Sequence, residues 1–565
     1  MQLPWGGMAL KYFLWAAWWL SSGVSCAPRS AGFRPFPGTP VIWQEDDRGH
    51  VAEVPVRRQL EAQDLGLFVR DFGSRELQRF LSLEQMKPAE DVNARDEVPC
   101  STWFCARHHL APMTTEALLA GPPGARPPVL PLAVTKSKDR GAAAGFSATD
   151  AQGHRFLIKL DPPHHPGLSS GAEIMGNLIF YGAGYNVAGA FSLHVPRDAF
   201  QLAEKATFQL SGVAERPFTR ARLDALLANA GRTREDEVSA AAIPWIEGEV
   251  LGAFDMMGTR ADDPNDRIPH QHRRSLRASR LLFGWLNVHD ASALNTLDSY
   301  VEEDGRRFVR HHFIDFGAGL GSASWRRKDV FEGRESLFPL SRLLASLLTL
   351  GIYQRDWQRD QAAHHASLGQ LPPALGWFHP THGWDPRAFH TNRKVPAHLR
   401  MTPRDGYWGA KVITSFTRAQ LRALVDFAYA GRGEADAVFE ALVWRQRRIG
   451  ETYLRGYAAV ESPHVEGSRL CYLDIAVARG FYPAAPRHVF ELLDARGRLV
   501  ARADMVTSQA RLCVPLPETG PARQAPYLVM AIRTQEATHT SRPSYVHLQR
   551  GVGGRLHVVG LERID

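Results

Sequence analysis

The sequence predicts an α+β protein in which a sheet-rich region is followed by a helical region and then by a C-terminal β-sandwich. Short strand patterns separated by turns begin at Leu130, and apolar residues recur at helical spacing between His270 and about Gly450. Alternating strand patterns return beyond Ser462. The chain has 565 residues and is 44% hydrophobic, which is ordinary for folded proteins and argues against a disordered, collagen-like or multi-span membrane chain.

The charge pattern does not predict nucleic-acid binding. The formal net charge is +8, but the positive residues are scattered along the chain and form no tail or stripe. Only 9 of the 67 positive residues are lysines and 58 are arginines, an imbalance typical of a GC-rich coding bias. A lysine that persists inside a strand is therefore informative.

Residues 1–25 have the pattern of a signal peptide. An apolar run at 12–24 follows Lys11, is too short for a spanning helix and ends in small residues before Cys26. We therefore expect an exported bacterial protein, either periplasmic or held to a membrane as a lipoprotein by a lipid anchor on Cys26. Residues 23–25 lack the large aliphatic residue usual before such a cysteine, so free secretion and an uncleaved membrane anchor stay open.

The remaining cysteines are even in number, as expected for an exported chain. They are Cys100, Cys105, Cys471 and Cys513. Pairing the first two and the last two would keep each disulfide within one region, and free thiols are the other simple interpretation. Cys100 and Cys105 with His108 and His109 also suggest a zinc site, although their spacing matches no common zinc finger.

The expected domains follow from changes in composition. Residues 26–127 are rich in proline and charge, include a short helix around 75–83, and form an extension that wraps a larger domain. The sheet-rich region spans 128–255, the helical region 256–455 and the β-sandwich 462–565. The sheet-rich region is expected to begin with an antiparallel meander; its strands are predicted at 130–135, 145–149, 154–160, 187–195 and 242–246, and its helices at 171–182 and 219–230.

The helical region and the sandwich have simpler patterns. Helices are predicted at 270–288, 336–350 and 418–429, the last with a capping box formed by Thr417 and Gln420. The sandwich is expected to be antiparallel. Its strands are predicted in a hairpin at 489–501 and at 527–534, 545–549 and 555–561.

Lys159 stands in an otherwise apolar strand, although nearly every other positive residue is arginine. A compact ammonium group beside Leu157, two residues back on the same strand face, suits a phosphate held below an apolar roof for a base. Glu173 follows in the first turn of the next helix, where its carboxylate can pair with Lys159. An ordinary edge-strand lysine is the alternative.

A second cluster supplies the other groups that phosphoryl transfer needs. Asp290 and Asn295 are separated by four residues directly after a long helix, and Asp315 opens an Asp-Phe-Gly sequence after an apolar run. These residues provide a carboxylate for the acceptor hydroxyl and oxygen ligands for Mg²⁺, while Lys159 provides a cation for phosphates.

The order of these elements resembles the protein-kinase-like fold over about residues 128–450, with an antiparallel sheet N-lobe and a helical C-lobe. The resemblance implies that ATP and Mg²⁺ bind between the two lobes, with Leu157 over the base and Gly141 and Gly145 in the phosphate-covering loop. It implies catalytic roles for Asp290, Lys159 and Glu173. It also implies that Asn295 and Asp315 ligate the metal.

The sequence departs from the usual protein-kinase pattern in three places. His289 directly precedes Asp290 without an intervening arginine, no Ala-Pro-Glu follows Gly317, and the loop at 140–146 is poor in glycine. These features are more similar to atypical members such as the HipA-type toxin kinases, the phosphatidylinositol kinases and the secreted casein-kinase-like enzymes.

We therefore expect a kinase that transfers the γ-phosphoryl group of ATP to an unknown protein, lipid or sugar acceptor. The alternative is a pseudokinase scaffold or binding module of the cell envelope that performs no catalysis.

One further segment combines acidic and basic residues. Asp262, Asp263 and Asp266 suggest calcium, although the spacing is not that of an EF-hand, and an ordinary polar loop is the favoured interpretation. Downstream, Arg273, Arg277 and Arg280 fall on one helical face that suits either an anionic substrate or, as favoured, a salt-bridged surface.

Overall fold

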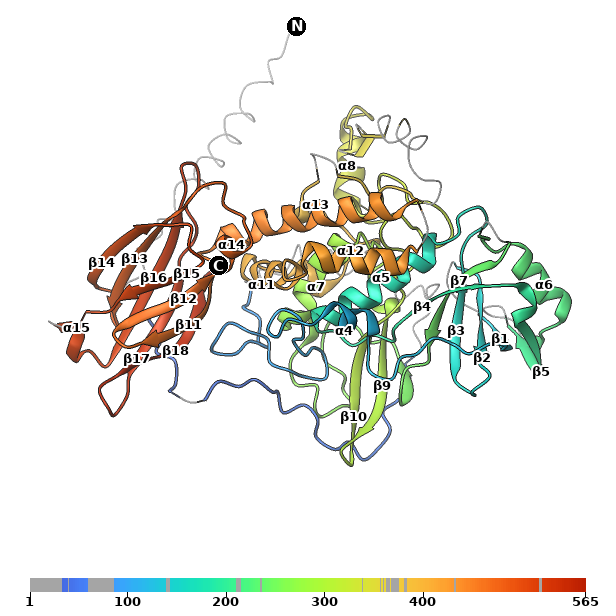
Figure 1. Ribbon diagram of the computed structural model, residues 1–565, viewed down its shortest axis with the longest axis horizontal. Helices are drawn as coiled ribbons and strands as arrows, with labels where there is room; N and C mark the ends of the chain where they lie inside the picture. The colour runs from blue at the N-terminus through green and yellow to red at the C-terminus, as the bar shows by residue number, and fades with distance from the viewer. Residues whose placement is uncertain are drawn as a thin grey trace, which may run out of the picture.

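The computed structural model describes residues 33–38, 40–58, 86–138, 143–209, 215–233, 236–337, 339–355, 357–358, 360–361, 366, 375–380, 384–430, 433–517 and 521–565. The predicted signal peptide, Cys26, the helix expected around 75–83 and Gly141 lie outside the described residues. The described chain is a mixed α/β structure with four sheets (Figure 1). None of its helices is both long and apolar enough to cross a membrane.

The first sheet has seven strands in the order β4-β7-β3-β2-β1-β5-β6. The strands are β1 Leu132–Ser137, β2 Gly145–Thr149, β3 Arg155–Leu160, β4 Phe191–Val195, β5 Phe200–Phe208, β6 Arg216–Pro217 and β7 Val238–Pro244. The predicted antiparallel meander of β1 to β3 is confirmed. The expectation of a wholly antiparallel sheet is wrong, because β5 pairs with β1 in parallel. The chain between β1 and β5 is long enough to cross over the sheet, as a parallel pair requires.

Two helices pack against the seven-stranded sheet, α6 Arg220–Ala228 and α5 Leu168–Ala183. Leu223 and Leu227 of α6 are buried in the same core cluster as the apolar strand residues. The start of α5 is held by Asp161, which directly follows β3. Its carboxylate accepts hydrogen bonds from the backbone N–H groups of Gly167, Ser169 and Ser170, so β3 and the first turn of α5 are fixed relative to each other.

The middle of the chain is mainly helical but contains a three-stranded sheet that the sequence analysis did not predict. Its strands, in the order β10-β9-β8, are β8 Glu249–Gly252, β9 Thr296–Glu303 and β10 Arg306–Phe313. The expectation that helices dominate here is therefore wrong for residues 296–313. The turn between β9 and β10 is Asp304-Gly305 with both φ angles positive, 50° and 72°, which is the conformation of a tight hairpin turn.

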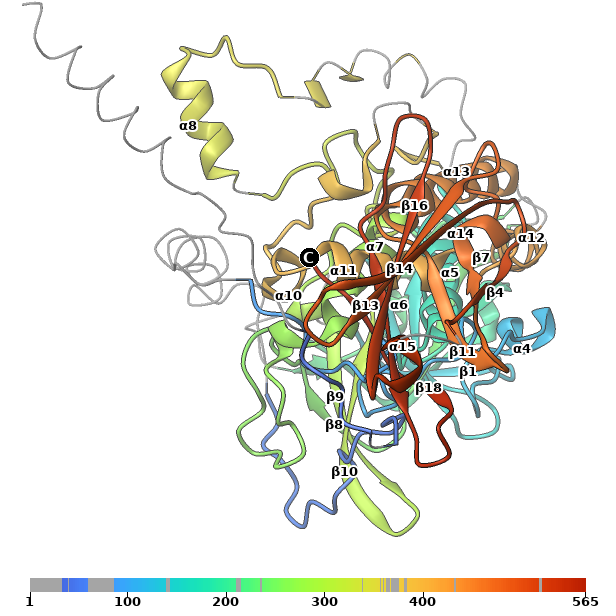
Figure 2. The same ribbon diagram turned by 90° about the vertical axis from the view of Figure 1, so that its left-hand side faces the viewer.

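The predicted helices of this region are present with shifted ends. The helix expected at 270–288 is a 3-10 turn followed by α7, and the capping box of Thr417 and Gln420 begins α12 as predicted. The α8 helix projects from the rest of the molecule (Figure 1 and Figure 2). The helices are α4 Thr115–Ala120, α7 Arg274–Trp285, α8 Leu340–Leu348, α10 Pro396–Leu399, α11 Pro403–Ile413, α12 Arg418–Ala428 and α13 Ala435–Tyr453.

Two antiparallel sheets form the C-terminal part, with the strand orders β11-β12-β15 and β14-β13-β16-β17-β18. Apolar residues from both sheets, among them Tyr472 and Phe490, share one buried core. The strands are β11 Val460–Glu466, β12 Arg469–Asp474, β13 Arg487–Asp494, β14 Leu499–Val506, β15 Arg511–Pro515, β16 Tyr527–Gln535, β17 Ser544–Arg550 and β18 Leu556–Arg563; two short helices are α14 Ile475–Ala478 and α15 Pro521–Gln524.

The four cysteines form two disulfides, Cys100–Cys105 and Cys471–Cys513. The second joins residues that face each other across β12 and β15. The zinc site considered for Cys100 and Cys105 is therefore wrong, because both sulfur atoms are engaged in a disulfide.

The N-terminal extension runs from the C-terminal sheets to the β9–β10 hairpin along one side of the molecule (Figure 1). Its buried residue Asp96 accepts hydrogen bonds from three arginines. They are Arg274 of α7 at 2.7 Å, Arg404 of α11 at 2.8 Å and Arg563 of β18 at 2.5 Å. Burial alone would raise the pKa of Asp96, but the three guanidinium groups hold it far below its ordinary value.

We predict that Asp96→Asn lowers the free energy of unfolding by about 3–5 kcal/mol, because it leaves several buried guanidinium groups without their counter-charge. The low pKa of Asp96 keeps its stabilising charge present throughout the neutral range and loses it only in strong acid. The loss in Asp96→Asn is therefore expected to be equal at mildly acidic and mildly basic pH. Asp504→Asn is the control, because this exposed carboxylate pairs with Arg487 at the surface; equal melting of the two variants would contradict the prediction.

Candidate functional site

Lys159 lies at the centre of a buried charge cluster between β3, α5 and the chain after β10. Its Nζ donates to Oε2 of Glu173 and to Oδ1 of Asp315, each at 2.8 Å. Lys159 and Glu173 are nearly fully buried, whereas the Asp315 side chain is 38% exposed. The predicted pairing of Lys159 with Glu173 is present, and Asp315 is the member of the cluster that is exposed to solvent.

The backbone around Asp315 is shaped by close packing against α5. Asp315 has a φ of 63°, a left-handed conformation that is uncommon for a residue with a side chain. The next residue, Phe316, is fully buried against Gly176, where a Cβ would come within 2.3 Å of the ring. The glycine thus lets Phe316 lie directly on α5, and this packing accompanies a backbone conformation that directs Asp315 toward Lys159.

Asp290 and Asn295 lie together in the loop between α7 and β9. The Nδ2 atom of Asn295 donates to the backbone oxygen of Asp290 at 2.7 Å, and the backbone oxygen of Asn295 accepts from the N–H of Ile314 at 3.1 Å. The second bond ties this loop to the residue directly before Asp315. All five predicted charged or amide residues are therefore brought to one region, although Asp290 and Asn295 do not contact Lys159.

The pKa values reflect this grouping. Burial would lower the pKa of Lys159, but the carboxylates of Asp315 and Glu173 outweigh it and raise the pKa above its ordinary value. Burial would raise the pKa of Asp315, but Lys159 holds it below its ordinary value. Burial and the negative charge of Asp315 raise the pKa of Asp290 to about 6, because they outweigh its hydrogen bonds and the charge of Arg393.

The loop that carries Asp290 is held by a buried network that sequence reasoning missed. His289 pairs through Nε2 with Glu332 at 3.1 Å, and Lys328 donates through Nζ to the backbone oxygens of Asn287 and Ala318. Burial lowers the pKa of Lys328 to about 7 and that of His289 to about 4. Lys328 is one of only nine lysines in the chain, so the rarity that singled out Lys159 also marks this residue.

An apolar pocket of about 270 Å³ opens beside the Lys159 cluster. Its charged lining residues are Lys159, Glu173 and Asp315, together with Arg57 and Lys138. Leu157 lines it, as its place on the same face of β3 as Lys159 predicted. The other apolar or aromatic lining residues are Ala188, Ile243, Pro244, Trp245, Ile246, Val250, Leu297 and Ile314.

Of the two glycines predicted to cover phosphates, Gly145 is described and faces Lys159 across the β2–β3 pair. A Cβ at this position would lie 2.2 Å from the backbone oxygen of Ile158, so the close approach of the two strands requires glycine. Gly145 is therefore a structural residue of the sheet next to the pocket.

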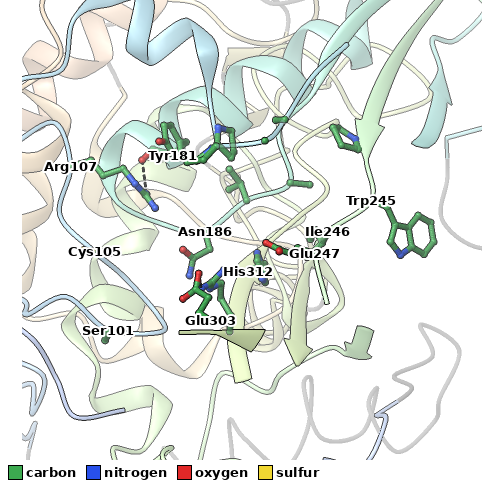
Figure 3. Close-up of a pocket in the computed structure, with 18 of the residues that line it drawn as sticks. Ser101, Cys105, Arg107, Tyr181, Asn186, Trp245, Ile246, Glu247, Glu303 and His312 are labelled. Atoms are coloured by element: carbon green, nitrogen blue, oxygen red, sulfur yellow. Dashed lines mark hydrogen bonds and ion pairs between the residues drawn. The ribbon is translucent and has the colours of Figure 1, made fainter. Parts of the chain in front are cut away.

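A larger cavity of about 590 Å³ lies on the other side of the segment that contains Trp245 and Ile246. Figure 3 shows Asn186, Glu303 and His312 together within it, with Arg107 beside Tyr181 at some distance. Arg107 donates to the backbone oxygen of Tyr181 at 2.8 Å. The two cavities share this segment of backbone as a common wall.

The acidic segment and the arginine helix form structural contacts. Asp266 accepts from the backbone N–H of Arg260 and pairs with His270, so it is engaged within its own loop. Arg273 and Arg277 are fully buried and bond to Glu45 and Asp405. The interpretations as a calcium loop and as a surface for an anionic substrate are therefore wrong, because internal partners occupy these groups.

No protein-family model, curated protein or solved structure matches the chain. The chemistry of the site is therefore argued from its own geometry.

Asp290→Asn is predicted to stabilise the protein at neutral and basic pH. The raised pKa means that the folded state disfavours the ionised carboxylate, so the penalty is absent below the unfolded pKa of about 4 and grows as the pH rises to about 6. Above that pH we expect Asp290→Asn to be more stable than the wild type by up to about 3 kcal/mol, at about 1.4 kcal/mol for each pKa unit.

Thermal unfolding between about pH 4 and pH 8 measures this effect, with Asp224→Asn on the exposed surface of α6 as the control for the chemical change. An Asp290→Asn variant that is less stable than the wild type at pH 8 would show that the carboxylate stabilises the loop instead.

Proposed function

We propose that the protein is an ATP- and Mg²⁺-dependent kinase with an atypical protein-kinase-like fold. In this proposal the seven-stranded sheet with α5 is the N-lobe, the helices from α7 to α13 belong to the C-lobe, and the two C-terminal sheets form an accessory β-sandwich. One observation carries the proposal: Lys159 joins Glu173 and Asp315 at the charged end of an apolar pocket. Asp290 and Asn295 belong to a loop tied to the same end.

Lys159 is suited to bind phosphates. Its raised pKa keeps the ammonium group charged at any physiological pH, so it acts as a fixed cation and not as a base. Glu173 on α5 orients it through the 2.8 Å ion pair. A phosphate group at Asp315 would replace part of the present contact between Lys159 and Asp315, while the contact with Glu173 keeps the lysine in place.

The apolar part of the pocket fits a flat base. Leu157, Ile243 and Leu297 line it, and residues 244–246 form one wall. The apolar lining and the charged end thus follow the two halves of a nucleotide, a base and its phosphates.

The residues present fit a divalent cation. Asp315 uses one oxygen for Lys159 and its side chain is 38% exposed. Asn295 donates through Nδ2 to the backbone of Asp290, which leaves Oδ1 as a ligand. The charges of Asp290 and Asp315 raise the pKa of Asp290, a repulsion that a cation would relieve. Hard oxygen ligands of this kind suit Mg²⁺, which would neutralise charge on the phosphates.

Asp290 is the group that acts on the acceptor. A carboxylate with a pKa of about 6 is largely ionised at pH 7 yet is more basic than an ordinary aspartate. It can orient an acceptor hydroxyl and accept its proton as the phosphoryl group is transferred. The acceptor is a protein, lipid or sugar that carries such a hydroxyl.

Export is proposed with the kinase, because two disulfides favour an oxidising compartment. The alternative is a pseudokinase scaffold or binding module of the cell envelope. It is favoured by the present engagement of Asp315 with Lys159, which satisfies the charge cluster without a ligand. Nucleotide binding distinguishes the two proposals.

We predict that Asp315→Asn reduces ATP turnover by orders of magnitude and weakens Mg²⁺-dependent nucleotide binding, because it removes one charge that holds the metal. Lys159 keeps its contact with Glu173, so the fold is expected to persist. The measurements are ATP consumption and the shift in melting temperature with ATP, with and without Mg²⁺.

Asp304→Asn is the matched control, because Asp304 lies in the β9–β10 turn, where asparagine tolerates the same positive φ. An Asp315→Asn protein that melts normally and retains wild-type turnover would remove Asp315 from the site. A wild type that binds no nucleotide at millimolar concentration would establish the scaffold.

A further inference from the structure

A cavity separate from the pocket beside Lys159 lies in the helical region between α13 and the chain after Asn287. Its volume is about 310 Å³, and it shares no lining residue with the Lys159 pocket. Trp357, Trp377 and Trp384 line it together with Arg445 of α13. It combines aromatic rings with a guanidinium group, and nothing in the proposed kinase reaction uses it.

Arg445 is a buried cation that lies between aromatic rings. Its side chain is 1% exposed, and its guanidinium lies 4.3 Å from the ring centre of Phe378 and 4.8 Å from that of Trp384. Its Nη1 donates to the backbone oxygen of Gly284 at 3.0 Å, whereas Nε has no hydrogen-bond partner. Among the described residues, no carboxylate forms an ion pair with it.

The electrostatic surroundings of Arg445 make the lack of an ion pair costly in free energy. Burial, together with the positive charge of Arg334, lowers the pKa of Arg445 to about 9. The other charged groups at the cavity are already matched: Arg334 pairs with Asp360 at 2.6 Å, and Arg342 with Glu335 at 3.4 Å. The lining carboxylates Glu332 and Asp385 pair with Arg326 at 2.9 Å and with Arg387 at 2.7 Å. Arg445 is the cation that remains, and stacking on aromatic rings offsets only part of the cost of burying it.

The unsatisfied groups of the cavity are all donors. Besides Nε of Arg445, the indole Nε1 of Trp357 is buried without a hydrogen-bond partner. No side-chain acceptor atom among the lining residues is buried without a hydrogen-bond partner. A ligand that completes the cavity must therefore supply acceptors, and one that balances Arg445 must supply negative charge.

We propose that this cavity binds a small oxyanion-bearing ligand whose carboxylate, sulfate or phosphate group pairs with Arg445. A volume of about 310 Å³ accommodates a group of monosaccharide size. The tryptophan rings offer flat apolar faces to the remainder of such a ligand. Acidic sugars and sugar phosphates combine these properties.

The cavity adjoins the loop that carries Asp290 without including it. Glu332 and Asn287 line the cavity, and they also contact His289 and Lys328, respectively. A ligand here would thus bind next to the support of that loop. The proposal itself is independent of the kinase chemistry, because it rests on Arg445 and Trp357 alone.

The test uses the full chain with four probes at matched ionic strength: inorganic phosphate, glucuronate, glucose 6-phosphate and uncharged glucose. We expect at least one of the three anions to raise the melting temperature saturably and glucose alone to have no effect. Comparison among the anions separates recognition of phosphate from recognition of a sugar carboxylate. Titration calorimetry gives the affinities.

Arg445→Met is expected to weaken anion binding at least about tenfold, the loss typical of a charged hydrogen bond. It should leave the melting temperature of the free protein unchanged or higher, because it removes an unpaired buried charge. Arg447→Met is the matched control on the same helix, since this arginine is 63% exposed and pairs with Glu451. It should bind as the wild type does.

Two further variants make the outcome decisive. Lys159→Met should retain the anion response. If Lys159→Met lost the response and Arg445→Met kept it, the anion would bind in the proposed nucleotide pocket, and the inference would be overturned. Trp357→Phe keeps an aromatic ring, although a smaller one, removes the indole N–H donor, and should weaken binding even if Arg445→Met fails to fold. A wild type without a saturable response to any anion at millimolar concentration would also overturn the inference.

Discussion

The burial of Asp96 beneath three arginines is the constraint on which the arrangement of the whole chain depends. The arginines come from α7, α11 and β18, so one carboxylate from the N-terminal extension joins the helical region to the C-terminal sheets. A buried ion cluster tolerates little displacement, because any partner that moves away leaves a charge without compensation. The neighbouring residue Glu97 adds a bond to Trp408 of α11, which strengthens the same junction.

The candidate site depends on the Asp96 ion cluster through α7. The helix begins at the Asp96 cluster with Arg274 and ends at Trp285, directly before the loop that carries Asp290. On the opposite side, α5 carries both Glu173 and Gly176, so one helix positions the partner of Lys159 and the packing surface for Phe316. The site is therefore assembled from two helices, each fixed at its N-terminus by a buried aspartate. Asp91 accepts from the first backbone N–H groups of α7, and Asp161 does the same for α5.

Local patterns in the sequence predicted the elements that local forces determine. The strand at 145–149 and the capping box at Thr417 are found as predicted, because alternation and capping depend on near neighbours. Strand β5 was missed because the exposed Glu204 and Lys205 interrupt its apolar pattern, and the Asp304-Gly305 turn was overlooked.

In the candidate site, too, some features follow from local sequence and others do not. The grouping of Lys159, Glu173 and Asp315 could be predicted from residue type and order, whereas the bond from His289 to Glu332 could not. Neither residue has a local pattern that indicates the other, and their contact exists only after 42 residues of intervening chain have folded. A contact of this kind is set by tertiary packing, which spacing alone does not reveal.

The pairing of Asp96 with Arg563 has a consequence for biosynthesis. The two residues are 467 positions apart, so a ribosome working at about 5–20 residues per second needs on the order of half a minute to a minute and a half between them. During that interval the carboxylate can meet Arg274 and Arg404 but lacks its last partner. The extension would therefore dock in stages. A nascent chain without its final strand would carry an incomplete Asp96 ion cluster that chaperones or proteases can recognise.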